Sequence, residues 1–243
     1  SDIGNDDSGN GKDFTAVGLA ASDVVPDSPT NNFNTLNPHN PLSHGTFSQG
    51  NLTVVLSGDD QFSSTQELLY KSYCEVRLDA SGNYGGAIGF GTMLGDNDQK
   101  ETLTFSVAYN SGQINTFTST DGNVGGTISV GDIVMMAYDP ATRKWWVGVN
   151  GTWRNSGDPA GGTGQVYQHG TDYFTESKLG AIVWGGWKGA ANGMTTTWNF
   201  GQDSTFGGQE TAGSNSDSNG IGNFKYSVPN GFLANCTSNL GAS

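Results

Sequence analysis

The chain has 243 residues, a formal net charge of −13 and only 10 lysines and arginines. Such an acidic chain repels the phosphate backbone of nucleic acids and anionic lipid headgroups, so we expect neither nucleic-acid binding nor membrane insertion. The composition also includes 38 glycines and only 14% charged residues, which is typical of short strands joined by many turns. We therefore expect an all-β protein.

Residues 1–50 are irregular, because four prolines interrupt any ladder of strand hydrogen bonds. We interpret this segment as an extended lead-in. After it, apolar residues alternate with polar ones in 51–57 and again in 72–79, which predicts two strands that each bury one face. Further segments have the β-branched and aromatic composition of strands bounded by turns: 85–92, 103–109, 113–119, 179–184 and 195–200.

The two cysteines, Cys74 and Cys236, lie far apart in the sequence and form one disulfide or none. Cys74 shares a strand face with Val76 and Leu78, so we interpret it as a small buried thiol. Two cysteines in a chain of this length do not make the disulfide framework of a small secreted domain.

The centre of the predicted fold is an antiparallel meander. The apolar runs 133–138 and 145–149 are separated by turn residues, and a second turn at Asn150 closes the next reversal. In the second run, alternate residues beginning with Trp145 share one face. Trp146 therefore points to solvent or to a neighbouring sheet.

The C-terminal part of the chain contains a long polar stretch. Residues 203–223 are rich in glycine, serine and asparagine, and we expect them to form a surface loop that is too polar to pack. Residues 228–233 then bring a short segment back to the core. About ten strands without an amphipathic helix predict a two-sheet antiparallel β-sandwich over residues 51–240.

The order of these motifs resembles the SPRY (B30.2-like) family, whose fold is a concanavalin-like two-sheet β-sandwich of the jelly-roll type. The matching stretches are, in order, KSYCEVRL, GGAIGFGT, SVGDIVMMAYDPATRKWWVGVNGTW, LGAIVW, TTWNFGQ and VPNGFLANC. The resemblance implies a binding module that contacts its partner through loops at one end of the sandwich. The fold alone does not name a ligand.

The lead-in contains DDSGNGKDFT followed by DSPTNNFNTLNP. This order resembles the segment that precedes such domains in tail-fibre and related virion proteins of tailed bacteriophages, where the first stretch would end an upstream unit. The resemblance implies a location on the virion surface or outside the cell, and binding to a host cell-surface glycan or protein. It also implies contacts with other virion proteins and display as a homotrimer.

The sequence leaves other functions open. A purely structural virion protein, such as a capsid fibre, a decoration protein or a tail-assembly part, fits the low charge and the Gly, Ser and Thr content equally well. A polysaccharide-degrading enzyme and a bacterial extracellular adhesin are further alternatives.

Aromatic residues in Gly-rich and Asn-rich turns are the best candidates for ligand contact. A flat ring can stack on the apolar face of a sugar, while neighbouring Asn, Asp and backbone groups bond its hydroxyls. The candidates are Tyr84, Trp146, Trp153 and Trp187. Other tryptophans are expected to fill the core: Trp145, Trp184 and Trp198.

The acidic residues do not form a recognisable catalytic pair. None of the five glutamates is spaced with another acid as in the E-x-D-x-x-E pattern of some sandwich glycosidases. Glu75 and Asp79 share a strand face, but Arg77 lies between them, and we interpret the three as an ion pair across strands. We therefore expect that the chain is not an enzyme.

No cofactor is expected. The histidines occur in turn-like contexts without a nucleophile or acid at a recognisable spacing, and we interpret them as surface residues: His39, His44 and His169. Acidic clusters could supply oxygen ligands to Ca²⁺, but none has the spacing of a known calcium loop, and turn formation explains them more simply: Asp6-Asp7, Asp59-Asp60 and Asp96-Asn97-Asp98.

Overall fold

The computed structural model describes residues 3–6, 8–18, 27–28, 30–39, 45–56, 61–81, 86–92, 103–108, 113–116, 120–123, 126–169, 179–184 and 193–241. The regular structure of these residues consists of fifteen strands and short 3-10 turns, so the predicted all-β class is confirmed. Within these ranges, no helix has the length and apolar character needed to cross a membrane.

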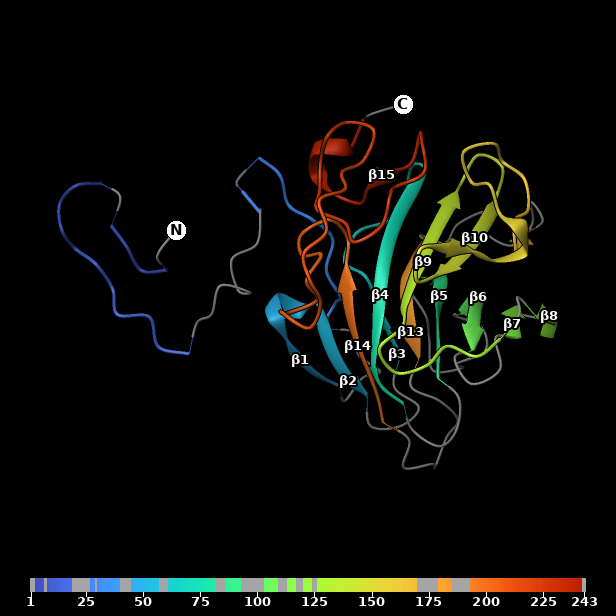
Figure 1. Cartoon of the computed structure of the whole chain (residues 1–243), viewed down its shortest axis with the longest axis horizontal. Coiled ribbons are helices and arrows are strands. Elements are labelled where there is room, and N and C mark those ends of the chain that lie inside the picture. Colours follow the sequence, from blue (N-terminus) through green and yellow to red (C-terminus); the bar gives the residue numbers. More distant parts are fainter. Residues whose placement is uncertain are drawn as a thin grey trace.

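The larger of two sheets has nine strands. Along its main path these are β1 (Thr46–Ser48), β2 (Thr53–Leu56), β14 (Met194–Asn199), β4 (Ser72–Ala80), β9 (Ile133–Asp139), β10 (Lys144–Val149) and β11 (Thr152–Trp153). Figure 1 labels β1, β2, β14, β4, β9 and β10 of this sheet. Neighbours on this path are antiparallel. Two short strands complete the sheet: β12 (Tyr167–Gln168) pairs with β10, and β15 (Leu233–Ala234) runs parallel to β4.

The smaller sheet has six antiparallel strands. In order these are β3 (Gln61–Ser63), β13 (Leu179–Trp184), β5 (Ala87–Thr92), β6 (Leu103–Ala108), β7 (Gln113–Thr116) and β8 (Thr120–Asn123). β6 and β7 form a hairpin, and the predicted meander is confirmed as β9, β10 and β11. In β5 the register with β6 shifts between Phe90 and Gly91.

The two sheets pack face to face around an apolar core, which confirms the predicted antiparallel sandwich. The inward faces follow the alternation in the sequence: Cys74, Val76 and Leu78 of β4 are all buried there, as predicted. Both sheets contribute, and the largest side chains of this inner core are Phe62, Phe90, Tyr138, Trp145, Trp198 and Phe200.

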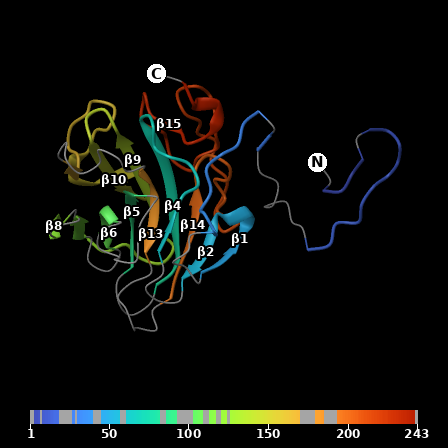
Figure 2. The same ribbon diagram turned by 180° about the vertical axis from the view of Figure 1, so that it is seen from behind.

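The outer face of the nine-stranded sheet is also buried over its central strands. It is covered by residues 200–241, which we call the C-terminal layer. In Figures 1 and 2 this layer, orange to red, lies beside β4 and β14 on the side away from β5 and β6. A second apolar cluster forms between them from Phe33, Tyr73, Met135, Ala137, Trp146, Phe224, Phe232, Ala234 and Cys236. Because both faces are covered, every residue of β9 is buried.

The prediction that residues 203–223 are too polar to pack is wrong. Phe206 is completely buried, and Asp217 is only 6% exposed. Polar side chains order this segment by bonding its backbone: Asp203 accepts two hydrogen bonds from N–H groups of its own turn. Asp217 accepts four, three of them from backbone N–H groups. These side-chain bonds replace water as the partner of the irregular backbone, so the segment can be buried without leaving its N–H groups unpaired.

Part of the predicted lead-in also belongs to the sandwich. In the segment 30–37, Phe33 enters the second apolar cluster and Leu36 enters the inner core. Phe33 and Leu36 form isolated bridges with Cys236 and Ser64, so the packed unit begins upstream of the predicted start at residue 51. Residues 3–18, in blue in Figure 1, lie apart from the sandwich.

The cysteines lie in the two different clusters. Cys74 faces the inner core, whereas Cys236 belongs to the second cluster on the other side of the nine-stranded sheet. Both thiols are buried and free. The interpretation of Cys74 as a small buried thiol is confirmed, and of the two pairing alternatives the structure shows the one without a disulfide.

Candidate ligand-binding surface

The structure describes two of the four predicted ligand-binding residues, Trp146 and Trp153. Tyr84 and Trp187 lie outside the described residues. Trp146 is 1% exposed, and its indole N–H donates a hydrogen bond of 2.8 Å to the carbonyl oxygen of Thr163. Phe232 of the C-terminal layer packs edge-on against it, with ring centroids 5.9 Å apart. The prediction that Trp146 contacts a ligand is therefore wrong, because this layer covers the face to which Trp146 points.

The predicted core tryptophans are confirmed where their side chains are described. Trp145 and Trp198 are completely buried, and Trp198 stacks on Phe200 with ring centroids 5.6 Å apart. The side chain of Trp184 lies outside the described part of the structure.

Trp153 is partly exposed, at the rim of the second apolar cluster. Its indole lies over Gly148, where an added Cβ atom would stand 3.2 Å from the ring. Tyr226 of the C-terminal layer is also partly exposed and covers the following turn in the same way, since a Cβ at Gly151 would stand 3.0 Å from its ring. We call Trp153 and Tyr226 the ring pair.

Tyr226 is not among the ligand-contact residues predicted from the sequence. Its position beside Gly151 depends on the path of the C-terminal layer, which local sequence patterns do not specify. One sequence feature does single out Tyr226: it is an aromatic residue that follows a long polar segment and belongs to no predicted strand.

Polar side chains occur in the turn between β10 and β11, just before β9 and just after β11. Asn150 has a φ of 49°, which agrees with the predicted turn. Its side chain donates to Asp132 at 2.7 Å and accepts from the backbone N–H of Ile133 at 2.9 Å. The guanidinium of Arg154 lies beside Gly126, where an added Cβ would stand 3.4 Å from it. Half-buried rings among amide, carboxylate and guanidinium groups can bind sugars or polar protein surfaces.

Glu75 of β4 lies under the C-terminal layer and is completely buried. Its Oε1 accepts hydrogen bonds from the hydroxyl of Tyr73 at 2.9 Å and from the backbone N–H of Tyr226 at 2.8 Å. Its Oε2 accepts from the backbone N–H of Lys225 at 2.9 Å and from the amide of Asn199 at 3.2 Å. Burial raises the pKa of Glu75, and these four hydrogen bonds oppose part of the rise.

The predicted ion pair of Glu75, Arg77 and Asp79 is wrong for Glu75. Arg77 pairs with Asp79 on its own strand and with Glu210 of the C-terminal layer, at 3.1 Å. Nζ of Lys225 lies 3.6 Å from Oε2 of Glu210. The layer supplies the second carboxylate for Arg77, while both oxygens of Glu75 are occupied by structural hydrogen-bond donors.

The histidines differ from the predicted surface placement at one position. His39 is exposed, as predicted. His169 is only 5% exposed, and its Nε2 lies 2.9 Å from the hydroxyl of Tyr138. The surface interpretation is therefore wrong for His169, because the end of the inner core provides it with an aromatic neighbour and a hydrogen-bond partner. His44 lies outside the described residues.

Of the acidic clusters considered for Ca²⁺, only Asp6 lies in the described ranges. Its carboxylate accepts hydrogen bonds from the backbone N–H groups of Ser8 and Lys12, at 2.9 and 3.1 Å. A hydrogen bond with the Ser8 side chain, together with these two backbone bonds, lowers the pKa of Asp6. The backbone bonds fit the turn-forming interpretation. Among the described residues, no group of three His, Cys, Asp or Glu side chains is placed to hold a metal ion.

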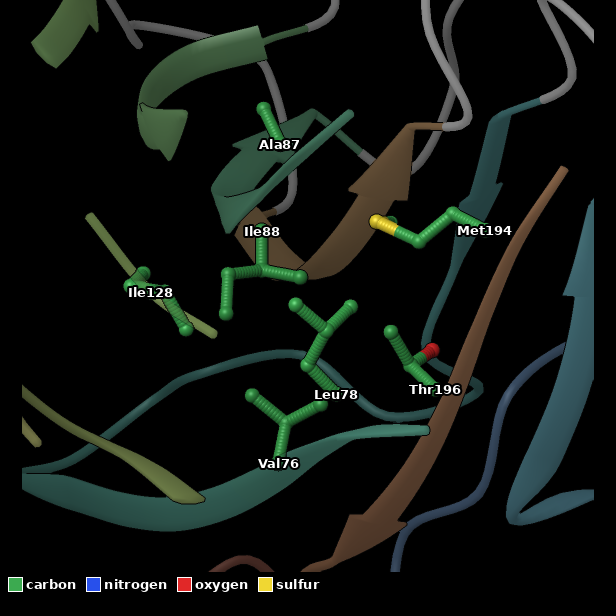
Figure 3. A pocket seen from close by; sticks show the side chains of 7 residues that line it. All are labelled: Val76, Leu78, Ala87, Ile88, Ile128, Met194 and Thr196. Atoms are coloured by element: carbon green, nitrogen blue, oxygen red, sulfur yellow. The ribbon is translucent and has the colours of Figure 1, made fainter. Parts of the chain in front are cut away.

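A small cavity lies between the two sheets (Figure 3). It is lined mainly by apolar side chains from both sheets: Val76, Leu78, Ala87, Ile88, Ile128, Met194 and Thr196. Its volume of about 10 Å³ is at the lower limit for one water molecule. A sugar ring or a peptide side chain does not fit there.

The strands that flank Tyr84 and Trp187 end close together. Trp184, at the end of β13, pairs with Ala87, at the start of β5. β14 begins opposite the end of β4, and side chains from β4, β5 and β14 line the same cavity. The turn between β10 and β11 lies at the same end of the nine-stranded sheet as the end of β4. The last residues of β10 pair with the first residues of β9, and these in turn pair with the second half of β4.

No protein-family model matches the sequence, and no curated protein matches it. Similar solved structures include the SPRY domain of human HERC1, with a TM-score of 0.47 and 14% identity over 63% of this chain and 91% of that one. Stonustoxin has a TM-score of 0.47 and 17% identity over 68% of this chain and 27% of its own. The carbohydrate-binding module CBM66 from Bacillus subtilis has a TM-score of 0.41 and 12% identity over 69% of this chain and 93% of that one. The sandwich described above follows from the strand pairing of this chain itself.

Proposed function

We propose that this chain is a non-enzymatic binding module of a tailed-bacteriophage virion surface, built on a SPRY-like sandwich, which binds a host cell-surface glycan or protein. The ring pair is the observation that carries this proposal. Trp153 and Tyr226 are held against backbone at Gly148 and Gly151, and each keeps part of its ring exposed. Rings that are already fixed lose little conformational entropy when a ligand stacks on them.

The proposed surface also includes the loops that carry Tyr84 and Trp187. The strands flanking these loops end on the side toward which the turn of the ring pair lies. In this proposal the rings stack on the apolar face of a sugar or on an apolar side chain, and Asn150 and Arg154 bond its polar groups. One such surface binds weakly, and display as a homotrimer would raise the overall affinity.

A purely structural virion role is the second candidate. Phe14 and Val17 are 80% and 85% exposed on the segment that lies apart from the sandwich. Exposed apolar side chains on such a segment suit packing against another virion protein.

The test is binding of labelled protein, displayed as a trimer, to intact cells of candidate hosts. We expect purified surface polysaccharide or protease treatment of the cells to abolish binding, according to whether the receptor is a glycan or a protein. The double variant Trp153→Ala and Tyr226→Ala should bind roughly tenfold more weakly or worse, since each tenfold corresponds to about 1.4 kcal/mol. The matched control is Leu69→Ser, an exposed residue just before the opposite end of β4.

Several outcomes would overturn the proposal. Absence of binding across a broad host panel, together with a stable complex with other virion proteins, would favour the structural role. Release of reducing ends from host polysaccharide would show a degrading enzyme. Equal binding by the double variant and the control would remove the ring pair from the site.

A further inference from the structure

A single buried carboxylate connects both members of the ring pair. We propose that Glu75 is the positioning residue of the proposed binding surface. It holds Tyr226 through the backbone N–H of that residue, and Trp153 through the ring of Tyr73. The consequence for binding rests on the proposed function, but the positions of the two rings can be tested without any ligand.

The first connection runs to Tyr226. The backbone N–H groups of Lys225 and Tyr226 donate to the two oxygens of Glu75, at 2.9 and 2.8 Å. A carboxylate that accepts hydrogen bonds from two consecutive backbone N–H groups fixes both the distance of that chain segment from the sheet and its direction. The C-terminal layer is irregular at this point, with no strand pairing over Lys225 and Tyr226, so the Glu75 contact sets where the Tyr226 ring meets Gly151.

The second connection runs to Trp153 through Tyr73. The Tyr73 hydroxyl lies 2.9 Å from Oε1 of Glu75, and the side chain is completely buried. Its ring packs edge-on against Trp153, with centroids 6.3 Å apart and planes at 69°, and against Phe224 at 5.1 Å. Because the hydroxyl is tied to Glu75, rotation of the Tyr73 ring is restricted, and so is the surface on which Trp153 rests.

Asp217 provides an internal comparison. It is another buried carboxylate that accepts four hydrogen bonds within the C-terminal layer. Its donors are the backbone N–H groups of Asn219, Ile221 and Ala234 and the amide of Asn239, and none of these belongs to the ring pair or to Tyr73. Loss of Asp217 should therefore loosen the layer without moving the rings.

The test uses the whole chain labelled with 5-fluorotryptophan and ¹⁵N. The Trp153 fluorine resonance is assigned with Trp153→Phe, and the backbone resonance of Tyr226 is followed in the same samples. We expect Glu75→Gln to shift both resonances, because one acceptor oxygen becomes an N–H₂ group that faces donors. Tyr73→Phe should shift the Trp153 resonance and leave the Tyr226 amide bonded. Asp217→Asn should change neither, although it lowers the melting temperature.

The positioning role would be overturned if Glu75→Gln left both resonances in place, or if Asp217→Asn moved them equally. Should Glu75→Gln fail to fold, Tyr73→Phe carries the same test for Trp153. Host-cell binding separates this inference from the proposed function: we expect Glu75→Gln to bind roughly tenfold more weakly. Shifted resonances with unchanged binding would keep Glu75 as the positioning residue and remove the ring pair from the binding site.

Discussion

The two faces of the nine-stranded sheet are buried in different ways. On the inner face, apolar side chains at alternate positions pack against those of the opposite sheet. On the outer face, a glycine-rich and polar layer contributes a few large aromatic residues, while its backbone is bonded by buried side chains such as Glu75 and Asp217. The comparison shows that polar composition alone does not make a segment exposed. A segment can be covered when side chains satisfy its backbone groups.

The largest expected effect tests whether the outer layer stabilises the protein as the inner core does. Phe224 of the layer and Phe90 of β5 are both completely buried. We expect Phe224→Ala and Phe90→Ala to lower the free energy of unfolding by similar amounts, about 3 to 5 kcal/mol each. Denaturant titration of both variants measures this. A loss below about 1 kcal/mol for Phe224→Ala alone would mean that the layer is only loosely attached.

A smaller effect is expected at Glu75, where the layer depends on a buried carboxyl group. Glu75→Gln should cost about 1 to 3 kcal/mol, because the new amide faces hydrogen-bond donors. The contribution of Glu75 to the free energy of unfolding changes with pH in a defined direction. Since burial raises the pKa of Glu75 above its ordinary value of 4.5, the folded state binds this proton more tightly than the unfolded chain does. The stability from this group is present at pH below 4.5 and is lost as the pH rises through the folded pKa.

Unfolding free energies of the wild type and Glu75→Gln, measured from acid to neutral pH, check this sign. The advantage of the wild type over the variant should shrink as the pH rises across that window. A constant difference between the two would mean that Glu75 has the same pKa in the folded and unfolded chains.

The smallest effect appears only at alkaline pH. The Tyr70 hydroxyl lies 3.0 Å from the carbonyl oxygen of Ala234 and accepts from the backbone N–H of Cys236 at 3.1 Å. Burial raises the pKa of Tyr70 to about 12 from 10.0. The unfolded chain therefore loses this proton first, and stability should fall as the pH rises from 10 toward 12. Tyr70→Phe should show a shallower fall in melting temperature over this range, and an identical slope would exclude Tyr70 as its source.

The inner half of the fold could be predicted from the sequence. Period-two alternation in 51–57 and 72–79, and the turn at Asn150, identified strands and a reversal that the structure confirms. These features are local, because a strand with one buried face shows its register in its own residues. Trp145 could be assigned to the inner core by the same rule.

The outer half could not be predicted in the same way. The place of Tyr226 depends on a bond to Glu75, a residue 151 positions earlier, and no local pattern reports such a bond. The burial of Trp146 follows from Phe232 in the layer, which also lies far along the chain. One local feature did indicate a second covered face: the apolar run 133–138 is continuous rather than alternating, as in strands buried on both sides.

Native-state hydrogen exchange of the backbone amides in residues 203–241, compared with those of β4, tests the account most directly. If the C-terminal layer is part of the packed fold, the amides of Lys225, Tyr226 and Ala234 should open only together with the sheet. We then expect protection within about tenfold of that of the β4 amides. Exchange of the layer at nearly unprotected rates, while β4 stays protected, would contradict the account, because neither the second apolar cluster nor the ring pair could then be held in place.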